Sequence, residues 1–352
     1  MRFSIFLDLG RVSPSTPTSQ LLEECTELVE MADAGGFETI FCGEHHGHEL
    51  TIAPNPLSLL AYWAGRVSRA RLGTAVVCAP YWHPIRLAGE AGLLDLVTGG
   101  RFDLGIGRGA YTYEFARMAA GMEPEAAREA LGEMLPALRG LWAGDYEHHG
   151  RLWDFPTTTS TPRPTQDGGP PVWVSARHPD VFRLAVENRC HLMVTPLGMP
   201  FAEVESLAER RDNAVAEVGS GHRPQMAVLR DTCVYDDESD RDIPVQAQIT
   251  HGRYFNSLFR TDGDVRTGWV QPVDSPRGDS DPEEVWENYA FGTPSQVIDK
   301  LKGYEAVGTD VFLYGATFGL DHAFERRSLE LFINEVMPAF ADTEPTSRTS
   351  AS

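Results

Sequence analysis

The 352-residue chain predicts a single-domain (β/α)8 barrel, the TIM-barrel architecture, with insertions. Short apolar segments of strand character alternate with segments in which apolar residues recur at helical spacing, and eight such strand segments can be counted along the chain. Glycines and polar residues gather where these strands end, which is the functional face of such a barrel. No repeat or linker divides the chain. An open, doubly wound parallel sheet is the alternative fold.

The first half of the chain shows this alternation most regularly. The expected strands are Arg2 to Asp8, Phe37 to Cys42, Arg71 to Cys78, and a strand of Phe102, Leu104 and Ile106 within the stretch Gly99 to Tyr111. The expected helices are Gln20 to Ala34, Asn55 to Val67 and Pro84 to Leu96. Gly35-Gly36 ends the first helix, because glycine readily adopts the left-handed conformation that closes one. Strands and helices in this order predict parallel strands joined by crossover helices.

The second half is less regular. A helix is expected over Glu125 to Trp142, and Tyr146 to Thr165 shows no periodic pattern. The remaining expected strands are Pro171 to Ser175, His191 to Thr195, Met226 to Tyr235 and Asp310 to Tyr314. The remaining expected helices are Pro179 to Asn188, Phe201 to Val218, Asp240 to Phe259, Pro294 to Ala306 and Ala323 to Pro338. Residues 260–285 predict a mobile lid loop and 341–352 a disordered tail, which leaves 1–340 as the barrel domain.

The net charge and the cysteines indicate which partners and which cellular compartment to expect. The net charge is −21, and phosphate backbones and anionic membranes attract Lys and Arg, so neither nucleic acid nor a membrane is expected as a partner. No apolar run approaches the roughly 20 residues that span a bilayer. The five cysteines lie far apart without a C-x-x-C pair, which favours reduced, buried thiols and a cytoplasmic location.

Two groups of strand-end residues can carry chemistry. Glu44-His45-His46 follows the second strand, and a histidine there suits proton transfer near neutral pH. Solvated or core histidines are the alternative, and the spacing does not favour a metal site, so no metal is expected. Arg108 lies among glycines after the fourth strand, where its planar charge suits phosphate or carboxylate. The sequence contains no G-x-S-x-G nucleophile elbow and no phosphate-binding loop with a lysine. It is therefore not expected to be a serine hydrolase or a nucleoside triphosphatase.

Several sequence blocks, in this order and spacing, resemble the bacterial luciferase-like family of flavin-dependent monooxygenases. They are Gly35-Gly36-Phe37-Glu38-Thr39, Glu44-His45-His46, Leu72-Gly73-Thr74-Ala75-Val76, His83-Pro84-Ile85-Arg86, Leu93-Leu94-Asp95, Gly100 to Gly109 and Gly292-Thr293-Pro294. The resemblance spans nearly the whole chain, from Arg2-Phe3 to Val336-Met337-Pro338. It is specific for the family and much less so for the substrate.

The resemblance implies a luciferase-like TIM barrel that binds reduced FMN. The reduced flavin reacts with O2 to give a C4a-hydroperoxyflavin, which oxygenates a small organic substrate. No convincing NAD(P)H fingerprint occurs, so a separate flavin reductase is the expected partner, and a homodimer is implied by the family. An F420-dependent dehydrogenase or reductase is the alternative enzyme. A non-catalytic flavin-binding or partner subunit is the alternative from another class.

The resemblance also assigns roles to individual residues. His45 matches the catalytic histidine, and Ala75-Val76 matches a non-prolyl cis peptide beside the flavin ring. Arg108 matches the ligand of the flavin phosphate, and Tyr111 lies in the adjoining loop.

A second segment of the cofactor site departs from the family pattern. Ser175, Ala176 and Arg177 follow the fifth strand where luciferases carry a different set of polar residues, and backbone N–H groups there can still hold phosphate. Glu44 completes the expected cofactor-binding set. Gly107 stands where light-emitting subunits carry a reactive cysteine, so light emission is not implied.

Overall fold

The computed structural model describes residues 1–119, 122, 124–260, 264–273 and 281–341. Its strands are β1 (Arg2–Phe6), β2 (Thr39–Cys42), β3 (Arg71–Thr74), β4 (Val77–Cys78), β5 (Phe102–Gly107), β6 (Tyr146–His149), β7 (Asp154–Thr158), β8 (Val172–Ser175), β9 (His191–Val194), β10 (Met226–Val234), β11 (Val265–Arg266), β12 (Trp269–Val270), β13 (Ala290–Gly292) and β14 (Val311–Gly315). Its α-helices are α1 (Thr18–Gly35), α2 (Pro56–Ala64), α3 (Pro84–Val97), α4 (Thr112–Met118), α5 (Pro124–Ala143), α6 (Pro179–Glu187), α7 (Phe201–Val218), α8 (Asp242–Leu258), α9 (Pro282–Asn288), α10 (Pro294–Ala306) and α11 (His322–Leu331).

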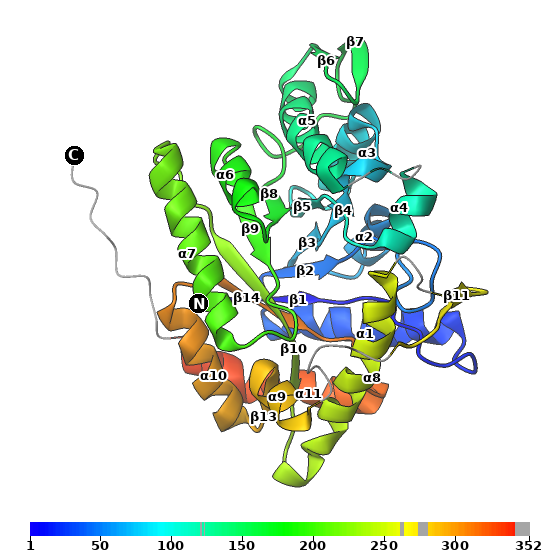
Figure 1. Cartoon of the computed structure of the whole chain (residues 1–352), viewed down its shortest axis with the longest axis vertical. Coiled ribbons are helices and arrows are strands. Elements are labelled where there is room, and N and C mark those ends of the chain that lie inside the picture. Colours follow the sequence, from blue (N-terminus) through cyan, green and yellow to red (C-terminus); the bar gives the residue numbers. More distant parts are fainter. Residues whose placement is uncertain (120–121, 123, 261–263, 274–280, 342–352) are drawn as a thin grey trace.

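A closed parallel barrel forms the centre of the molecule (Figure 1). Its strands follow the order β14, β1, β2, β3, β5, β8, β9 and β10, and β10 returns to pair with β14. β4 continues the line of β3 and also pairs with β5. Since the sheet closes on itself, the predicted barrel is confirmed and the open doubly wound sheet is wrong.

Alternation along each strand divides the side chains between the lumen and the surrounding helices. Phe41, Trp173, Met193, Ala227 and Leu313 pack together inside the barrel. Their immediate neighbours along the strands belong to the large cluster between the sheet and the helices. The parallel strands therefore need apolar residues on both faces, which explains why the sequence showed them as continuous apolar runs.

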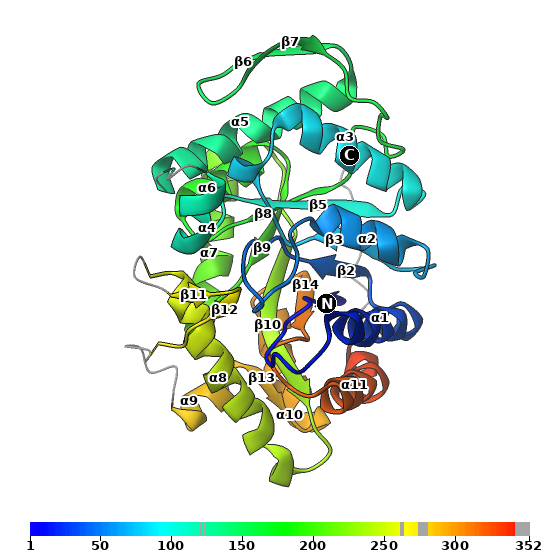
Figure 2. The ribbon, with the colours of Figure 1, turned by 90° about the vertical axis from the view of Figure 1, so that its right-hand side faces the viewer.

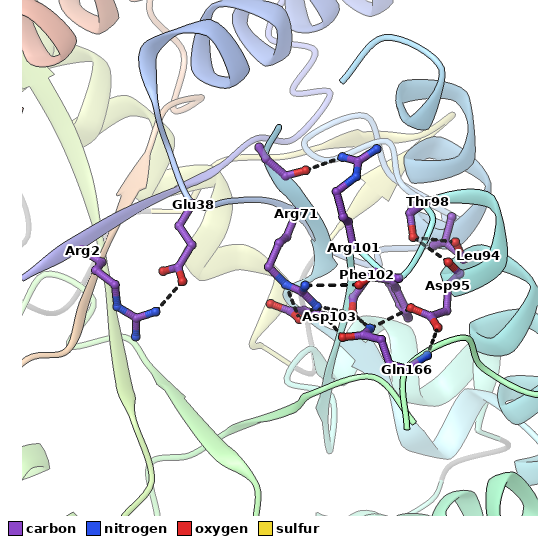
Figure 3. Close-up of polar contacts among 12 residues, drawn as sticks. Arg2, Glu38, Arg71, Leu94, Asp95, Thr98, Arg101, Phe102, Asp103 and Gln166 are labelled. Atoms are coloured by element: carbon purple, nitrogen blue, oxygen red, sulfur yellow. Dashed lines mark hydrogen bonds and ion pairs between the residues drawn. The ribbon is translucent and has the colours of Figure 1, made fainter. Parts of the chain in front are cut away.

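An ion pair lies near the end of the lumen at which the strands begin. Arg71 of β3 donates from Nη2 to Oδ1 of Asp103 on β5 at 2.6 Å, and from Nη2 to Gln166 at 3.0 Å (Figure 3). Asp103 has the same parity on β5 as Gly105 and Gly107, so it faces the lumen. Ligand sites of such barrels lie at the opposite end, where the strands finish.

Several elements were not expected from the sequence. β6 and β7 form an antiparallel hairpin within the stretch that showed no periodicity, and Figures 1 and 2 both place it beyond α5 at one end of the molecule. α4 is only 7 residues long, which is too short to show helical periodicity. Within the predicted lid loop, β11 and β12 form a small hairpin beside α8 (Figure 2). Residues 261–263 and 274–280 of that predicted loop, and 342–352 of the predicted tail, lie outside the described residues.

The five cysteines are all buried and free, as predicted. Within the described residues, no helix combines the length and the apolar character needed to cross a membrane.

Candidate active site at the carboxyl ends of the barrel strands

The open end of the lumen is formed by residues that continue the inward-facing positions of the strands. Asp8 follows Phe6 of β1, Gly43 follows Phe41 of β2, and Asp231 follows Ala227 and Leu229 along β10. Gly107 ends β5 and Ser175 ends β8. The two residues lie side by side in the sheet, because the preceding residues, Ile106 and Val174, are partners in the β5–β8 register. We call the level that contains Asp8, Gly43, Gly107, Ser175 and Asp231 the barrel mouth.

One side of the mouth is lined by small residues. The Ala75–Val76 peptide bond is cis, as predicted, and it separates β3 from β4. A Cβ atom added at Gly107 would lie 2.7 Å from Cγ2 of Val76 and 3.3 Å from Cβ of Ser175. Gly107 therefore lies directly against the side chains of Val76 and Ser175, and any larger residue at this position would clash with Val76.

His45 is held by Glu114, which comes from the unpredicted helix α4. Nδ1 of His45 lies 3.1 Å from Oε1 of Glu114, and the backbone N–H of His46 donates to the same oxygen at 2.7 Å. A carboxylate can only accept, so Nδ1 of His45 carries the hydrogen and Nε2 is the nitrogen left to exchange a proton. The Glu114 side chain is 1% exposed and that of His45 is 20% exposed, so the histidine is the accessible member of the pair.

The two groups shift each other's pKa in opposite directions. Burial lowers the pKa of His45, but the hydrogen bond to Glu114 and the charge of that carboxylate outweigh burial, and the net shift is upward. Burial raises the pKa of Glu114, yet its hydrogen bonds lower it to about 2. Glu114 is thus ionised at any ordinary pH, and it favours a protonated His45 near neutrality.

Replacing Glu114 with glutamine is expected to lower the pKa of His45, because the opposing effect of burial then dominates. Folding raises the pKa of His45, so protonated His45 contributes to the free energy of unfolding. This contribution is fully present below the pKa of the unfolded state, about 6.5, and it is lost as the pH rises through the pKa of the folded state. The stability difference between wild type and Glu114→Gln should therefore shrink with rising pH. NMR titration of the imidazole measures the shift directly.

Glu133 provides a matched control for that substitution. Its carboxylate lies 3.3 Å from Nε2 of His148 beside the β6–β7 hairpin, away from the mouth. Glu133→Gln is expected to leave the pKa of His45 unchanged, and an equal effect of both variants would contradict the assignment of Glu114.

Tyr111 forms a wall behind His45. The two rings stack with centroids 4.6 Å apart and planes inclined by 21°. Phe255 and Phe259 of the α8 region meet the other edges of the Tyr111 ring at 5.7 and 5.0 Å. An aromatic surface therefore continues from His45 to α8.

Glu44 is a buried structural anchor in the described site. One carboxylate oxygen accepts from the backbone N–H of Cys78 at 2.7 Å and from Nε1 of Trp82 at 2.9 Å. The other oxygen lies 2.8 Å from Nε2 of His46. Glu44 thereby ties the end of β2 to β4, and its predicted contact with cofactor stays a prediction.

The two predicted phosphate segments are neighbours at the same end of the barrel. Arg108 follows β5, and Ser175, Ala176 and Arg177 follow the adjacent strand β8. Ser175 and Arg177 are exposed, whereas Ala176 is buried and donates from its backbone to Met193. Helix α6 begins just beyond, where its first N–H groups can attract an anion.

A further group of side chains has the composition of a metal site. One donor atom from each of His45, His48 and Glu114 can be chosen so that all lie within 4.8 Å of one another. The Nε2 atom of His48 is 3.5 Å from Glu114 and forms no hydrogen bond within the described structure. The absence of a metal from the site remains a prediction.

Sequence reasoning missed Glu114, Asp8, Asp231 and the α8 residue Gln248. Asp8 and Asp231 lay inside predicted strands, and their inward parity was available from the alternation of neighbouring apolar residues. Glu114 gave no such signal, because its helix is short and its partner His45 is 69 residues away.

Comparisons with known proteins identify the family of the chain. A family model described as luciferase-like monooxygenase matches residues 1–311. The chain is 41% identical over 348 residues to the oxygenase component of a flavin-dependent trigonelline monooxygenase from Acinetobacter baylyi, covering 98% of this chain and 97% of that protein.

Solved structures share the fold. The monooxygenase RslO1 from Streptomyces bottropensis superposes with a TM-score of 0.83 at 26% identity, covering 97% of this chain and 100% of that one. The oxygenating constituent of 3,6-diketocamphane monooxygenase from Pseudomonas putida, solved with FMN, has a TM-score of 0.74 at 22% identity, covering 96% and 98%. At that identity the second likeness shows the fold alone.

Proposed function

Since the chain belongs to the luciferase-like monooxygenase family, we propose that it is the oxygenase component of a two-component enzyme that oxygenates a small organic substrate with O2. It is a flavin-dependent monooxygenase, and the flavin proposed for it is FMN. A separate reductase supplies the reduced flavin. The observation that carries this proposal is the pairing of His45 with Glu114 beside a mouth whose other side is lined by small residues.

The residues present fit a flavin. Gly107 leaves one wall of the mouth without a side chain, because a Cβ at that position would press on Val76 and Ser175. The hydroxyl of Tyr81 is buried and has no hydrogen-bond partner among the described residues, and it lies 3.4 Å from the place of a Cβ at Gly109, in the Arg108 loop. That unsatisfied group and the two neighbouring arginine segments suit a phosphate-bearing ligand.

Each side chain then has a separate task. Arg108 and Arg177 hold the phosphate with the N-terminus of α6, and Ser175 and Ala176 line its approach. Bound reduced FMN supplies the electrons that allow one atom of O2 to enter the substrate. His45 holds or releases a proton at Nε2, because Nδ1 is engaged by Glu114.

The remaining features of the proposal rest on the family resemblance and the composition. A homodimer in the cytoplasm is proposed, with no nucleic-acid or membrane partner. Residues 260–285 are proposed to cover the mouth. In support, the β11–β12 hairpin lies against this end of the barrel, where the backbone N–H of Glu49 donates to the carbonyl of Gly268 at 2.7 Å.

The function is tested by supplying reduced cofactor to the purified chain. With FMN, NADH and a flavin reductase, trigonelline is the first substrate to try, because it appears in the name of the 41% identical relative. The expected result is O2 consumption with a product heavier than the substrate by one oxygen atom. Turnover with reduced F420 and none with reduced FMN would favour the dehydrogenase alternative, and flavin binding without turnover on any substrate would favour the non-catalytic subunit.

A further inference from the structure

Two carboxylates face the mouth from the side opposite the small residues. Asp231 shares the inward parity of Ala227 and Leu229 on β10, and Asp8 shares that of Phe6 on β1. β14 lies between these strands, and it offers Gly315 as the partner of Asp231. Oδ1 of Asp231 lies 2.6 Å from where a Cβ of Gly315 would be, so the carboxylate leans across the lumen over a residue that has no side chain.

Neither carboxylate forms an ion pair within the described part of the chain. Asp8 accepts from the backbone N–H of Gly43 at 3.2 Å. Arg230 precedes Asp231, but strand alternation sends its guanidinium outward, where it donates to the hydroxyl of Tyr304 and to the carbonyls of Leu197 and Met199. Within the described residues, no Lys or Arg side chain forms an ion pair with either carboxylate, and His45 is the positive group that acts on Asp8.

Gln248 of α8 adds an unpartnered acceptor at the same place. Its side chain is 5% exposed and hydrogen-bonds with Asp231, so the amide nitrogen must be the donor. The amide oxygen, Oε1, is buried without a partner in the described structure. The partial negative charge of this buried oxygen adds to that of the two carboxylates at the same place.

The same face of α8 carries an aromatic surface. His251 and Phe255 lie three and seven positions after Gln248, so the three side chains share one side of the helix. The rings of His251 and Phe255 stack with centroids 6.1 Å apart, and Phe255 meets Tyr111, which stacks on His45. Oxygen acceptors and ring faces together suit an aromatic cation, because a cation is attracted by carboxylates and by the faces of aromatic rings.

We propose that the substrate carries a fixed positive charge on an aromatic ring, as in an N-alkylpyridinium, and that Asp231 and Asp8 bind this charge with the ring against the α8 aromatic surface. This inference rests on the proposed monooxygenase function and specifies its substrate class. The positive charge of the substrate would lie beside Asp8 and Asp231, on the β1 and β10 side of the mouth. The rest of the ring would then face His45.

The titration of the two carboxylates agrees with a missing counter-charge. Burial raises the pKa of Asp231 to about 7, although the hydrogen bond with Gln248 and the charge of Arg230 both lower it. Burial also raises the pKa of Asp8, although His45 and the backbone of Gly43 lower it. A bound cation would stabilise the ionised form of both groups.

Isothermal titration calorimetry with two ligands of the same shape tests the proposal. One ligand has a positively charged ring nitrogen where the other has a neutral carbon. Trigonelline is N-methylpyridinium-3-carboxylate, and 3-methylbenzoate has the same shape with carbon in place of the charged nitrogen. With the FMN-loaded wild-type chain, trigonelline is expected to bind at least about tenfold more tightly. Asp231→Asn is expected to weaken trigonelline binding by at least about tenfold and to leave 3-methylbenzoate unchanged or tighter.

Two further variants make the result specific. Asp154→Asn removes one negative charge from the exposed β6–β7 hairpin and is expected to change neither affinity. Asp8→Asn repeats the test at the second carboxylate, and it decides the outcome if Asp231→Asn fails to fold. Equal binding of the two ligands, equal weakening of both by the aspartate variants, or no binding of either would overturn the proposal.

This experiment separates the inference from the function on which it rests. Binding is measured without turnover, so a charge preference that depends on Asp231 in a chain that oxygenates nothing would leave the inference standing and refute the function. Oxygenation of uncharged substrates only, with no charge preference in binding, would leave the function standing and refute the inference.

Discussion

His45→Ala is expected to lower the rate of substrate oxygenation by about 10²- to 10⁴-fold, the usual contribution of a positioned general acid or base. The imidazole is the accessible member of the buried pair with Glu114, and Nε2 is its exchangeable nitrogen. Since the predicted phosphate ligands Arg108 and Arg177 are untouched, FMN binding should change far less than turnover does. Reductase-coupled turnover and FMN titration measure the two quantities separately.

His149 offers the matched control for this substitution. It lies in the β6–β7 hairpin with a side chain 70% exposed, and its partner there is Asp154. His149→Ala should leave both turnover and FMN binding at the wild-type level. If His45→Ala retained wild-type turnover, His45 would have no role in proton transfer, and a non-catalytic function of the pair would have to be considered.

Gly105→Ala is expected to destabilise the barrel by about 3 kcal/mol or more, at the upper end of the cost of overpacking a core. A Cβ at this position would lie 1.8 Å from the backbone oxygen of Thr74, which cannot move as a flexible side chain could. The hydroxyl of Thr74 also donates to the carbonyl of Gly105 at 2.7 Å and accepts from its N–H at 2.9 Å. A methyl group would therefore disrupt the junction of β3 and β5. Urea denaturation measures the change.

The same chemical change has the opposite expected effect at Gly132. This residue lies inside α5, and a Cβ there would meet nothing within 4 Å. Gly132→Ala should stabilise the chain by about 0.5–1 kcal/mol, because alanine loses less backbone entropy in a helix. Similar free energies of unfolding for the two variants would show that the contact with Thr74 is not decisive.

The sequence predicted the barrel well because its signals are local. The boundaries of α7 were predicted at Phe201 and Val218, as the structure has them, since apolar spacing and a closing glycine mark both ends. The β6–β7 hairpin was missed because it is a short antiparallel excursion with few buried residues. The strand ends His45 and Arg108 could be selected because parallel strands of a barrel finish at one face.

By itself, the sequence determined the order of strands and helices, the end of the barrel that carries polar residues, and the placing of His45 and Arg108 at that end. The cis Ala75–Val76 bond was expected from the family resemblance alone. Only the tertiary structure decided which side chains meet there. The contact of His45 with Glu114 spans 69 residues, and Gln248 reaches Asp231 from a helix rather than from a strand. Such contacts depend on how the closed sheet and α8 bring distant segments together, and periodicity along a chain carries no information about that closure.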